Sequence, residues 1–115
     1  MSAKVLTNKS AIRAKVTNAN REVTIACTTA IIEYGNIFVR EDSGDLKDSS
    51  YIASDPEKGE AVWDMPYAKR MYYTGTPVKD KNPNASLMWA EKGVNTYRKE
   101  LDQTAQNAFN KGFKL

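Results

Sequence analysis

The chain has 115 residues, 41% hydrophobic and 27% charged, with a net charge of +3 and no histidine. This length suits one soluble domain with a single core, and no apolar run approaches the roughly 20 residues of a membrane-spanning helix. The one cysteine, Cys27, excludes an internal disulfide, and the lack of histidine excludes Ser-His and Cys-His nucleophile pairs. The basic N-terminus has no apolar signal segment, so we expect a cytoplasmic protein.

The charges are unevenly distributed along the chain. Residues 1–40 are mainly basic, whereas residues 41–64 hold eight acidic and two basic side chains. A positive patch on one copy can meet a negative patch on the next, so this pattern favours head-to-tail contact between copies. Acidic turns between basic helices would give the same pattern, and the sequence leaves both interpretations open. General nucleic-acid-binding proteins are usually more basic than this chain.

The first predicted element is a long helix over residues 10–38. Apolar side chains recur there every three or four residues, which marks one face of a helix, and Ser10 suits the N-cap. Residues 23–31 also alternate as a strand would, but the helical spacing runs much longer and favours the helix. Cys27 has small and apolar neighbours, so it is predicted to be a buried space-filler rather than a reactive thiol.

A β-hairpin is predicted after this helix. Gly44 suits a helix exit or a tight turn. Residues 49–54 (SSYIAS) and 60–65 (EAVWDM) are predicted to be short strands, because the DPEKG sequence between them has the composition of a turn. Trp63 on the second strand is expected to face the core, and Pro66 should end that strand.

The remaining elements are less regular. Residues 67–74 fit either a turn of helix or a third strand at MYYT. Residues 75–84 contain two prolines and lack apolar periodicity, which predicts an exposed loop. The last predicted helix begins near Ser86, and Gly112 is expected to mark its end.

Together these elements predict one α+β domain that spans residues 1–115. It has a long N-terminal helix, a small antiparallel sheet formed by the hairpin with or without the third strand, a long loop, and a C-terminal helix. The ends, residues 1–9 and 112–115, are expected to be flexible.

No sequence pattern predicts a catalytic, cofactor or metal site. The acidic run at 41–48 comes nearest to a metal site, but its glycine lies at the wrong offset for an EF-hand, and Leu46 and Lys47 interrupt the ligands. Asp64 lies beside large apolar residues, and an outward-facing strand position explains it better than a catalytic one. The sequence has no phosphate-binding loop, nucleophile elbow or zinc spacing. We therefore expect no enzymatic activity.

Residues 61–76 (AVWDMPYAKRMYYTGT) concentrate aromatic and basic side chains. Proteins that bind single-stranded nucleic acid combine such residues, because bases stack on aromatic rings. The candidates for that activity are Trp63, Tyr67, Lys69, Arg70, Tyr72 and Tyr73. However, Pro66 interrupts the strand on which these rings would be displayed. Core and subunit interface explain the same aromatics, since Tyr, Trp and Met are enriched at interface centres.

Four motifs follow one another along the chain: DSGDL at 42–46, VWDMPYA at 62–68, YYTGT at 72–76, and ASLMW at 85–89 with Lys92. In this order they resemble the small minor capsid and tail-completion proteins of tailed bacteriophages. The resemblance covers about residues 10–110 and implies a long helix, an S/T-G-x-L turn, a strand pair and a tryptophan-bearing C-terminal helix. Relatives often have a proline before the turn, where this chain has Val39-Arg40-Glu41, so the path out of the first helix stays open.

The resemblance implies a structural protein of the virion neck, made in the host cytoplasm, where rings of such proteins join the head to the tail. The family's minor capsid label also covers a place in the capsid shell. The implied partners are other copies of the chain and neighbouring neck, portal-adaptor or tail-tube proteins, with non-specific contact to DNA in the channel. Neither a cofactor nor a membrane is implied.

Two sets of residues carry these expectations. The motif residues, expected to shape the turn and to anchor the sheet against the helices, are Ser43, Gly44, Leu46, Trp63, Pro66, Tyr67, Gly75 and Trp89. The expected assembly surface comprises Glu41, Asp42, Asp45, Lys69, Arg70, Tyr72, Tyr73, Lys79 and Lys81. The loop at 75–84 is expected to stay free and to become ordered on docking.

Overall fold

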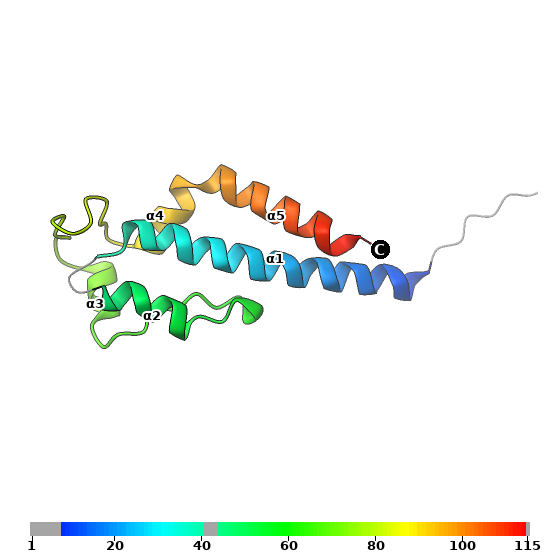
Figure 1. Ribbon diagram of the computed structural model, residues 1–115, viewed down its shortest axis with the longest axis horizontal. Helices are drawn as coiled ribbons and strands as arrows, with labels where there is room; N and C mark the ends of the chain where they lie inside the picture. Colours follow the sequence, from blue (N-terminus) through cyan, green and yellow to red (C-terminus); the bar gives the residue numbers. More distant parts are fainter. Residues whose placement is uncertain (1–7, 41–43, 115) are drawn as a thin grey trace, which may run out of the picture.

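The structure is a computed structural model that describes residues 8–40 and 44–114. Its elements are α1 (Lys9–Phe38), α2 (Asp45–Ala53), the 3-10 helix η1 (Pro56–Lys58), α3 (Ala68–Tyr73), α4 (Trp89–Thr96) and α5 (Arg98–Phe113). The long α1 runs through the middle, with α4 and α5 along one side and α2 along the other (Figure 1). Within the described ranges, no helix has the length and apolarity needed to cross a membrane.

The predicted first helix is confirmed as α1, which spans about 45 Å at 1.5 Å per residue. It begins slightly earlier than predicted, because the side chain of Asn8 rather than Ser10 caps it by accepting a hydrogen bond from the Ala11 amide at 3.2 Å. The alternating residues 23–31 are helical throughout. The longer periodicity therefore decided the local structure.

The predicted α+β fold is wrong, because the described residues form helices joined by irregular segments and contain no strand, only the β-bridge between Asp55 and Glu60. The segment predicted as the first strand, 49–54, lies mostly in α2. Asp45 and Asp48 occupy the first turn of α2, where carboxylates interact favourably with the positive end of the helix dipole. That local preference, together with the burial of Leu46, outweighs the weak strand propensity of six residues.

The segment predicted as the second strand, 60–65, is extended but has no strand to pair with. Serine side chains of the α2 segment satisfy its backbone instead: Ser54 Oγ accepts from the Val62 amide at 2.8 Å, and Ser49 Oγ accepts from the Asp64 amide at 3.1 Å. The DPEKG segment does make the predicted turn, as η1 closed by the antiparallel bridge between Asp55 and Glu60, but no strands extend from it. The third strand is also wrong, since MYYT falls largely within α3.

The C-terminal helix is divided and starts later than predicted. It begins at Trp89 rather than near Ser86, and Tyr97 separates α4 from α5. Gly112 lies one residue before the end of α5, close to the predicted end, and it is buried. A Cβ at Gly112 would approach Ala19 Cα to 2.6 Å, and one at Gly93 would approach the Tyr34 carbonyl carbon to 2.7 Å. Both glycines therefore let the C-terminal helices lie directly on the backbone of α1.

The core lies where the C-terminal end of α1 meets the short helices. Its buried members are Phe38, Val39, Leu46, Ala68 and Trp89. They come from α1, the residue after it, α2, α3 and α4. Trp63 packs against this cluster and against Gly35 of α1, where a Cβ would approach its ring to 2.9 Å. Trp63 therefore anchors its segment against helices rather than anchoring a sheet.

The loop at 75–84 is mostly exposed, as predicted, but it is not free. Asn82 is buried, and its Nδ2 donates to the carbonyls of Ile37 and Val39 at 2.9 Å each. Arg40 holds the start of the loop by donating to the carbonyl oxygens of Thr74 at 2.7 Å and Thr76 at 3.4 Å. The loop therefore satisfies carbonyl groups at the end of α1, which a helix cannot satisfy internally.

Candidate assembly surfaces

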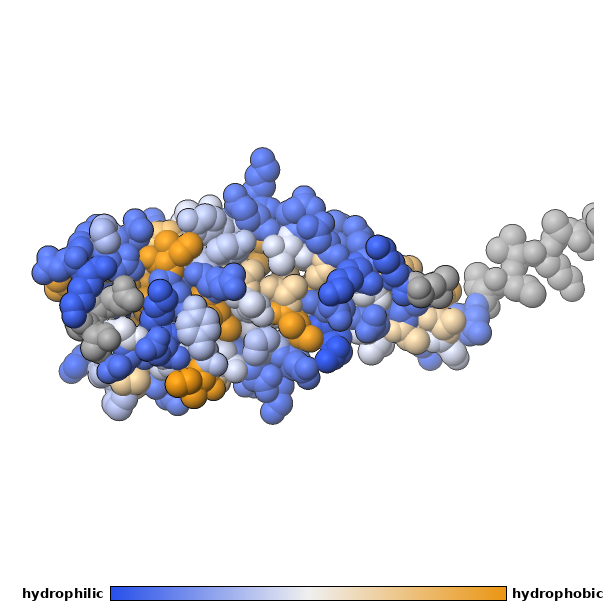
Figure 2. All heavy atoms as spheres, viewed as in Figure 1, coloured by the Kyte–Doolittle hydropathy of each residue, from blue (hydrophilic) through white to orange (hydrophobic). Residues whose placement is uncertain are grey.

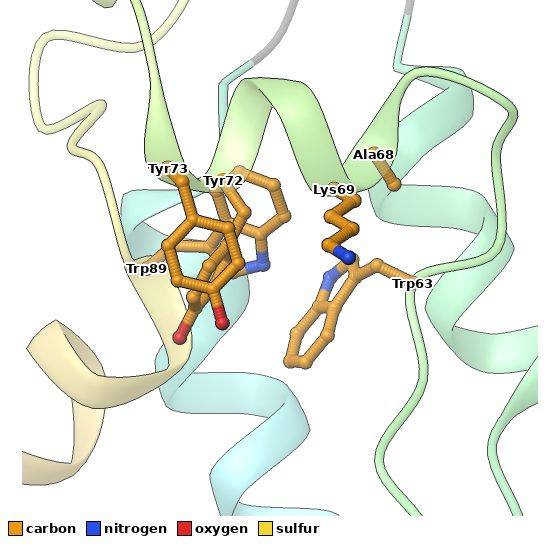
Figure 3. Close-up of a pocket in the computed structure, with 6 residues that line it drawn as sticks. All are labelled: Trp63, Ala68, Lys69, Tyr72, Tyr73 and Trp89. Carbon is orange, nitrogen blue, oxygen red and sulfur yellow. The ribbon is translucent and has the colours of Figure 1, made fainter.

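Five aromatic and basic residues of the sequence prediction converge on one open hollow beside α3. Its lining comprises Trp63, Ala68, Lys69, Tyr72, Tyr73 and Trp89, and its volume is about 230 Å³. Figure 3 shows Tyr72 and Tyr73 beside Trp89 on one side and Lys69 next to Trp63 on the other. We call this the aromatic hollow. Tyr67 and Arg70 do not line it, although the sequence groups them with its members.

Ring-to-ring contacts hold the aromatic hollow together. Trp89 is 1% exposed, and its indole meets Tyr72 at 4.6 Å and Trp63 at 6.1 Å between centroids, both edge-on. Such edge-to-face pairs are a preferred aromatic geometry. Burial is also the main cause that raises the pKa of Tyr72 above its ordinary value of 10.0. Much of the aromatic surface is consequently used for packing, and Tyr73, 57% exposed, is the ring most open to solvent.

The two indole N–H groups differ in their partners. Trp63 Nε1 donates to Asn36 Oδ1 at 2.9 Å, and Asn36 Nδ2 donates to Ser50 Oγ at 2.8 Å, so this chain of polar groups ties 60–65 to α1 and α2. The buried Trp89 Nε1 finds no hydrogen-bond partner among the residues that the structure describes. An unpaired buried donor costs stability, which the extensive packing of Trp89 must outweigh.

A second hollow, of about 420 Å³, lies between α2 and the extended segment that follows it. Three exposed carboxylates line it, those of Asp45, Asp48 and Asp64, together with apolar Ile52 and Met65. Ile52 is 86% exposed. We call this surface the acidic hollow. No group of three or more His, Cys, Asp or Glu residues that could hold a metal ion occurs in the described part of the chain.

A third surface lies where the start of α1 meets the end of α5. Ile12 and Val16 of α1 and Phe109 and Phe113 of α5 are all more than a third exposed, and the two Phe rings stack at 5.5 Å. Lys15 Nζ lies 5.6 Å from the Phe113 ring centroid. Figure 2 shows pale orange surface at this end, among blue hydrophilic atoms. We call the surface formed by Ile12, Val16 and Phe113, together with the exposed cations Lys9 and Arg13, the basic end.

The remaining predicted residues lie outside these surfaces. Glu41, Asp42 and Ser43 lie outside the described residues. Lys79 and Lys81 are exposed in the loop, and Arg70 is exposed on α3. Gly44, with a φ of 84°, precedes α2, and Gly75, with a φ of 83°, follows α3. Pro66 is exposed just before α3.

Sequence reasoning missed the acidic hollow as a unit and missed the basic end entirely. Asp45 was expected at an assembly surface, but Asp48, Ile52 and Asp64 were not grouped with it. The helical spacing of Ile12 and Val16 was visible, yet such spacing normally indicates core. Cys27, expected to be buried, is only half-buried, and burial followed by nearby Asp102 raises the pKa of its thiol.

In comparisons with protein families, curated proteins and solved structures, nothing matched this chain. The functional conclusion therefore depends on the motif order and on the three surfaces. Two of these combine exposed apolar side chains with charges of one sign, which suits contact with another macromolecule. The aromatic hollow is lined by neither carboxylate nor thiol.

Proposed function

We propose that the protein is a structural component of the neck of a tailed bacteriophage, where copies form a ring that joins the head to the tail. The observation that carries this proposal is the order of the four motifs, from DSGDL to ASLMW, which resembles minor capsid and tail-completion proteins. The helical fold departs from the strand pair that this resemblance implied. The motif residues Leu46, Trp63 and Trp89 nevertheless meet in or against one core.

The distribution of surfaces supports an assembly role. The acidic hollow and the basic end lie at different places along α1, and each exposes apolar side chains at a cost that contact with a partner would remove. A bridging protein needs at least two separate contact surfaces. The lysines and arginine near the loop, Lys69, Arg70, Lys79 and Lys81, would contact a neighbouring protein or DNA in the channel.

The test is the copy number and location of the protein in purified virions. Quantitative mass spectrometry of separated heads, tails and whole particles should find copies for one or two rings, associated with the head–tail junction. Deletion of the gene should leave DNA-filled heads and unattached tails. Intact infectious particles after deletion, or absence of the protein from particles, would contradict the neck proposal.

A place in the capsid shell is the alternative within the structural class. Exposed Ile52 and the acidic hollow would serve there equally well as contacts to a shell lattice. Copy number separates the two roles, because a shell protein would be present in hundreds of copies on heads and would remain on heads that lack tails.

Nucleic-acid binding is the candidate from a different class, and the convergence of Lys69, Tyr72, Tyr73 and Trp63 on one hollow favours it. Base stacking requires open ring faces, and here the rings largely contact one another. Oligonucleotides would quench tryptophan fluorescence with an affinity that falls as salt rises. Absence of quenching at low salt would exclude this candidate, and Lys69→Glu should abolish any quenching that occurs at the hollow.

A further inference from the structure

We infer that copies of this chain associate head to tail, with the basic end of one copy seated on the acidic hollow of the next. The inference rests on the proposed function, because a ring needs a contact between neighbouring copies, and it names the surfaces that form that contact. It depends on three properties of the described residues: an apolar patch on each surface, opposite charges around the patches, and their separation along α1.

The acidic hollow has the features of a docking surface for an apolar group that is itself surrounded by positive charges. Ile52, 86% exposed, projects beside Met65, and the three carboxylates of Asp45, Asp48 and Asp64 line the same hollow. No salt bridge of these carboxylates with a described Lys or Arg side chain is present. The hydrogen bond from the Asp64 amide to Ser49 Oγ holds the extended segment against α2, so the hollow is built into the fold.

The basic end presents the complementary surface. Positions 9, 12, 13 and 16 fall within about 100° of one another around α1, so Lys9 and Arg13 flank Ile12 and Val16 on one face. Phe113 of α5 reaches the same end, with Lys15 over its ring. None of the described carboxylates forms a salt bridge with Lys9, Arg13 or Lys15.

The two surfaces cannot meet within one molecule. Ser50 of α2 bonds to Asn36, which places the acidic hollow near the C-terminal end of α1. Val16 precedes Asn36 by 20 residues, which corresponds to about 30 Å along a continuous helix. A contact between two different patches of identical chains is heterologous, and such contacts produce rings when the rotation closes.

The association is tested with purified full-length protein and two charge-reversed variants. The double variant Asp48→Lys, Asp64→Lys carries two positive surfaces. The double variant Lys9→Glu, Arg13→Glu carries two negative ones. Sedimentation equilibrium should show salt-sensitive association of the unaltered chain that is at least tenfold weaker for each variant alone. An equimolar mixture of the two variants should recover association, because each positive surface again meets a negative one.

The controls separate a lost contact from a lost fold. Lys9→Glu places a carboxylate in the first turn of α1, which favours the helix, and circular dichroism should confirm that both charge-reversed variants keep their helical content. The double variant Arg98→Glu, Lys99→Glu changes the net charge by the same amount as Lys9→Glu with Arg13→Glu. Its positions are exposed on α5, and it should leave association unchanged. Ile52→Ser, at a position with almost no packing, should weaken association without loss of helix.

A cross-linking measurement gives a second, independent readout. In a Cys27→Ser background, mixing equal amounts of Ile52→Cys protein and Ile12→Cys protein under oxidising conditions should give far more mixed disulfide dimer than random collision, which yields about twice as much mixed dimer as each homodimer. A monomeric unaltered chain, a mixture that does not recover association, or a mixed dimer no more abundant than random collision gives would overturn the inference. The neck proposal would then still be decided separately, by the composition of particles.

Discussion

The two ends of α1 are packed in different ways. At its C-terminal end, Phe38 and Val39 join a core with Leu46, Ala68 and Trp89, and the loop bonds to the last carbonyls of the helix. At its N-terminal end, α5 lies on α1 through a seam of small residues, Ala19 against Gly112, with apolar side chains left more than a third exposed. One end is thus stabilised within the chain, whereas the other leaves apolar surface exposed.

This contrast means that stability and assembly should respond to different substitutions. Changes near Trp89 should lower the free energy of unfolding strongly, because buried volume is lost there. Changes at the basic end should affect contacts between copies more than the fold. The following substitutions measure this difference, beginning with the largest expected effect.

Trp89→Ala should lower the free energy of unfolding by about 3–5 kcal/mol, because it leaves a large cavity among Phe38, Trp63 and Tyr72. Urea denaturation followed by circular dichroism measures the loss. Trp89→Phe should cost clearly less, since it keeps a ring and removes an indole N–H that has no partner. Tyr73→Ala, at an exposed neighbouring ring, is the matched control, and a similar loss there would contradict the assignment of the core.

Gly93→Ala and Gly112→Ala test the two ends with the same substitution. Both added Cβ atoms would meet α1 backbone, at 2.7 Å and 2.6 Å respectively, and overpacking of this kind costs about 1–3 kcal/mol. Gly93 follows the fixed Trp89 and precedes Tyr97, which stacks on Tyr34 at 4.8 Å, so α4 cannot move away. Gly112 is one residue from the end of α5, so displacing it disturbs little more than its hydrogen bond from Asn18 Nδ2 at 2.7 Å, and its cost should be nearer the lower figure.

Thermal and urea unfolding measure both glycine variants, with Lys99→Ala on the exposed face of α5 as the control that should change little. Hydrogen exchange adds a local readout: Gly112→Ala should speed exchange in the last turns of α5 alone. Equal costs for the two glycines would mean that both ends of α1 are equally constrained.

Asn36→Ala should lower the free energy of unfolding by about 1–2 kcal/mol, because it leaves the Trp63 N–H without an acceptor in a half-buried site. The same substitution in a Trp63→Phe background should cost less, since the donor is already gone. A double-mutant cycle on urea unfolding measures this coupling. If the two losses simply add, the 2.9 Å hydrogen bond contributes nothing to stability.

The sequence predicted α1 correctly because its apolar spacing runs along most of the 30-residue helix, long enough to outweigh the alternation at 23–31. It failed at 49–54, since six residues carry too little pattern to compete with tertiary contacts. The signal for α2 was present in Gly44 followed by Asp45 and Asp48, a left-handed residue before two carboxylates in a first helical turn. That signal describes a helix start rather than a hairpin.

The candidate surfaces were predictable only in part. The aromatic segment 61–76 indicated a cluster, and most of its rings do lie together, but the contribution of Trp89 comes from a helix that is distant in sequence. The exposure of Ile52 could not be foreseen from a strand assignment, which gives every second residue to the core. Likewise, the sequence predicts only a helix end at Gly112. The contact with Ala19 shows that this glycine also allows α5 to pack closely on α1.

The smallest expected effect concerns the salt bridge between Arg21 and Glu57, which connects α1 to η1 between the two ends. The atoms lie 3.0 Å apart, but the side chains are 55% and 67% exposed, so water screens the attraction. Arg21→Ala should therefore lower the free energy of unfolding by less than about 1 kcal/mol, and salt should reduce that difference further. Urea unfolding at low and high salt measures it, with Arg13→Ala as an exposed control that has no salt bridge to a described carboxylate. A loss above this figure that persists in high salt would show that the Arg21 stem packs on η1, and that the well-packed part of α1 extends nearer the basic end than the contrast between its two ends implies.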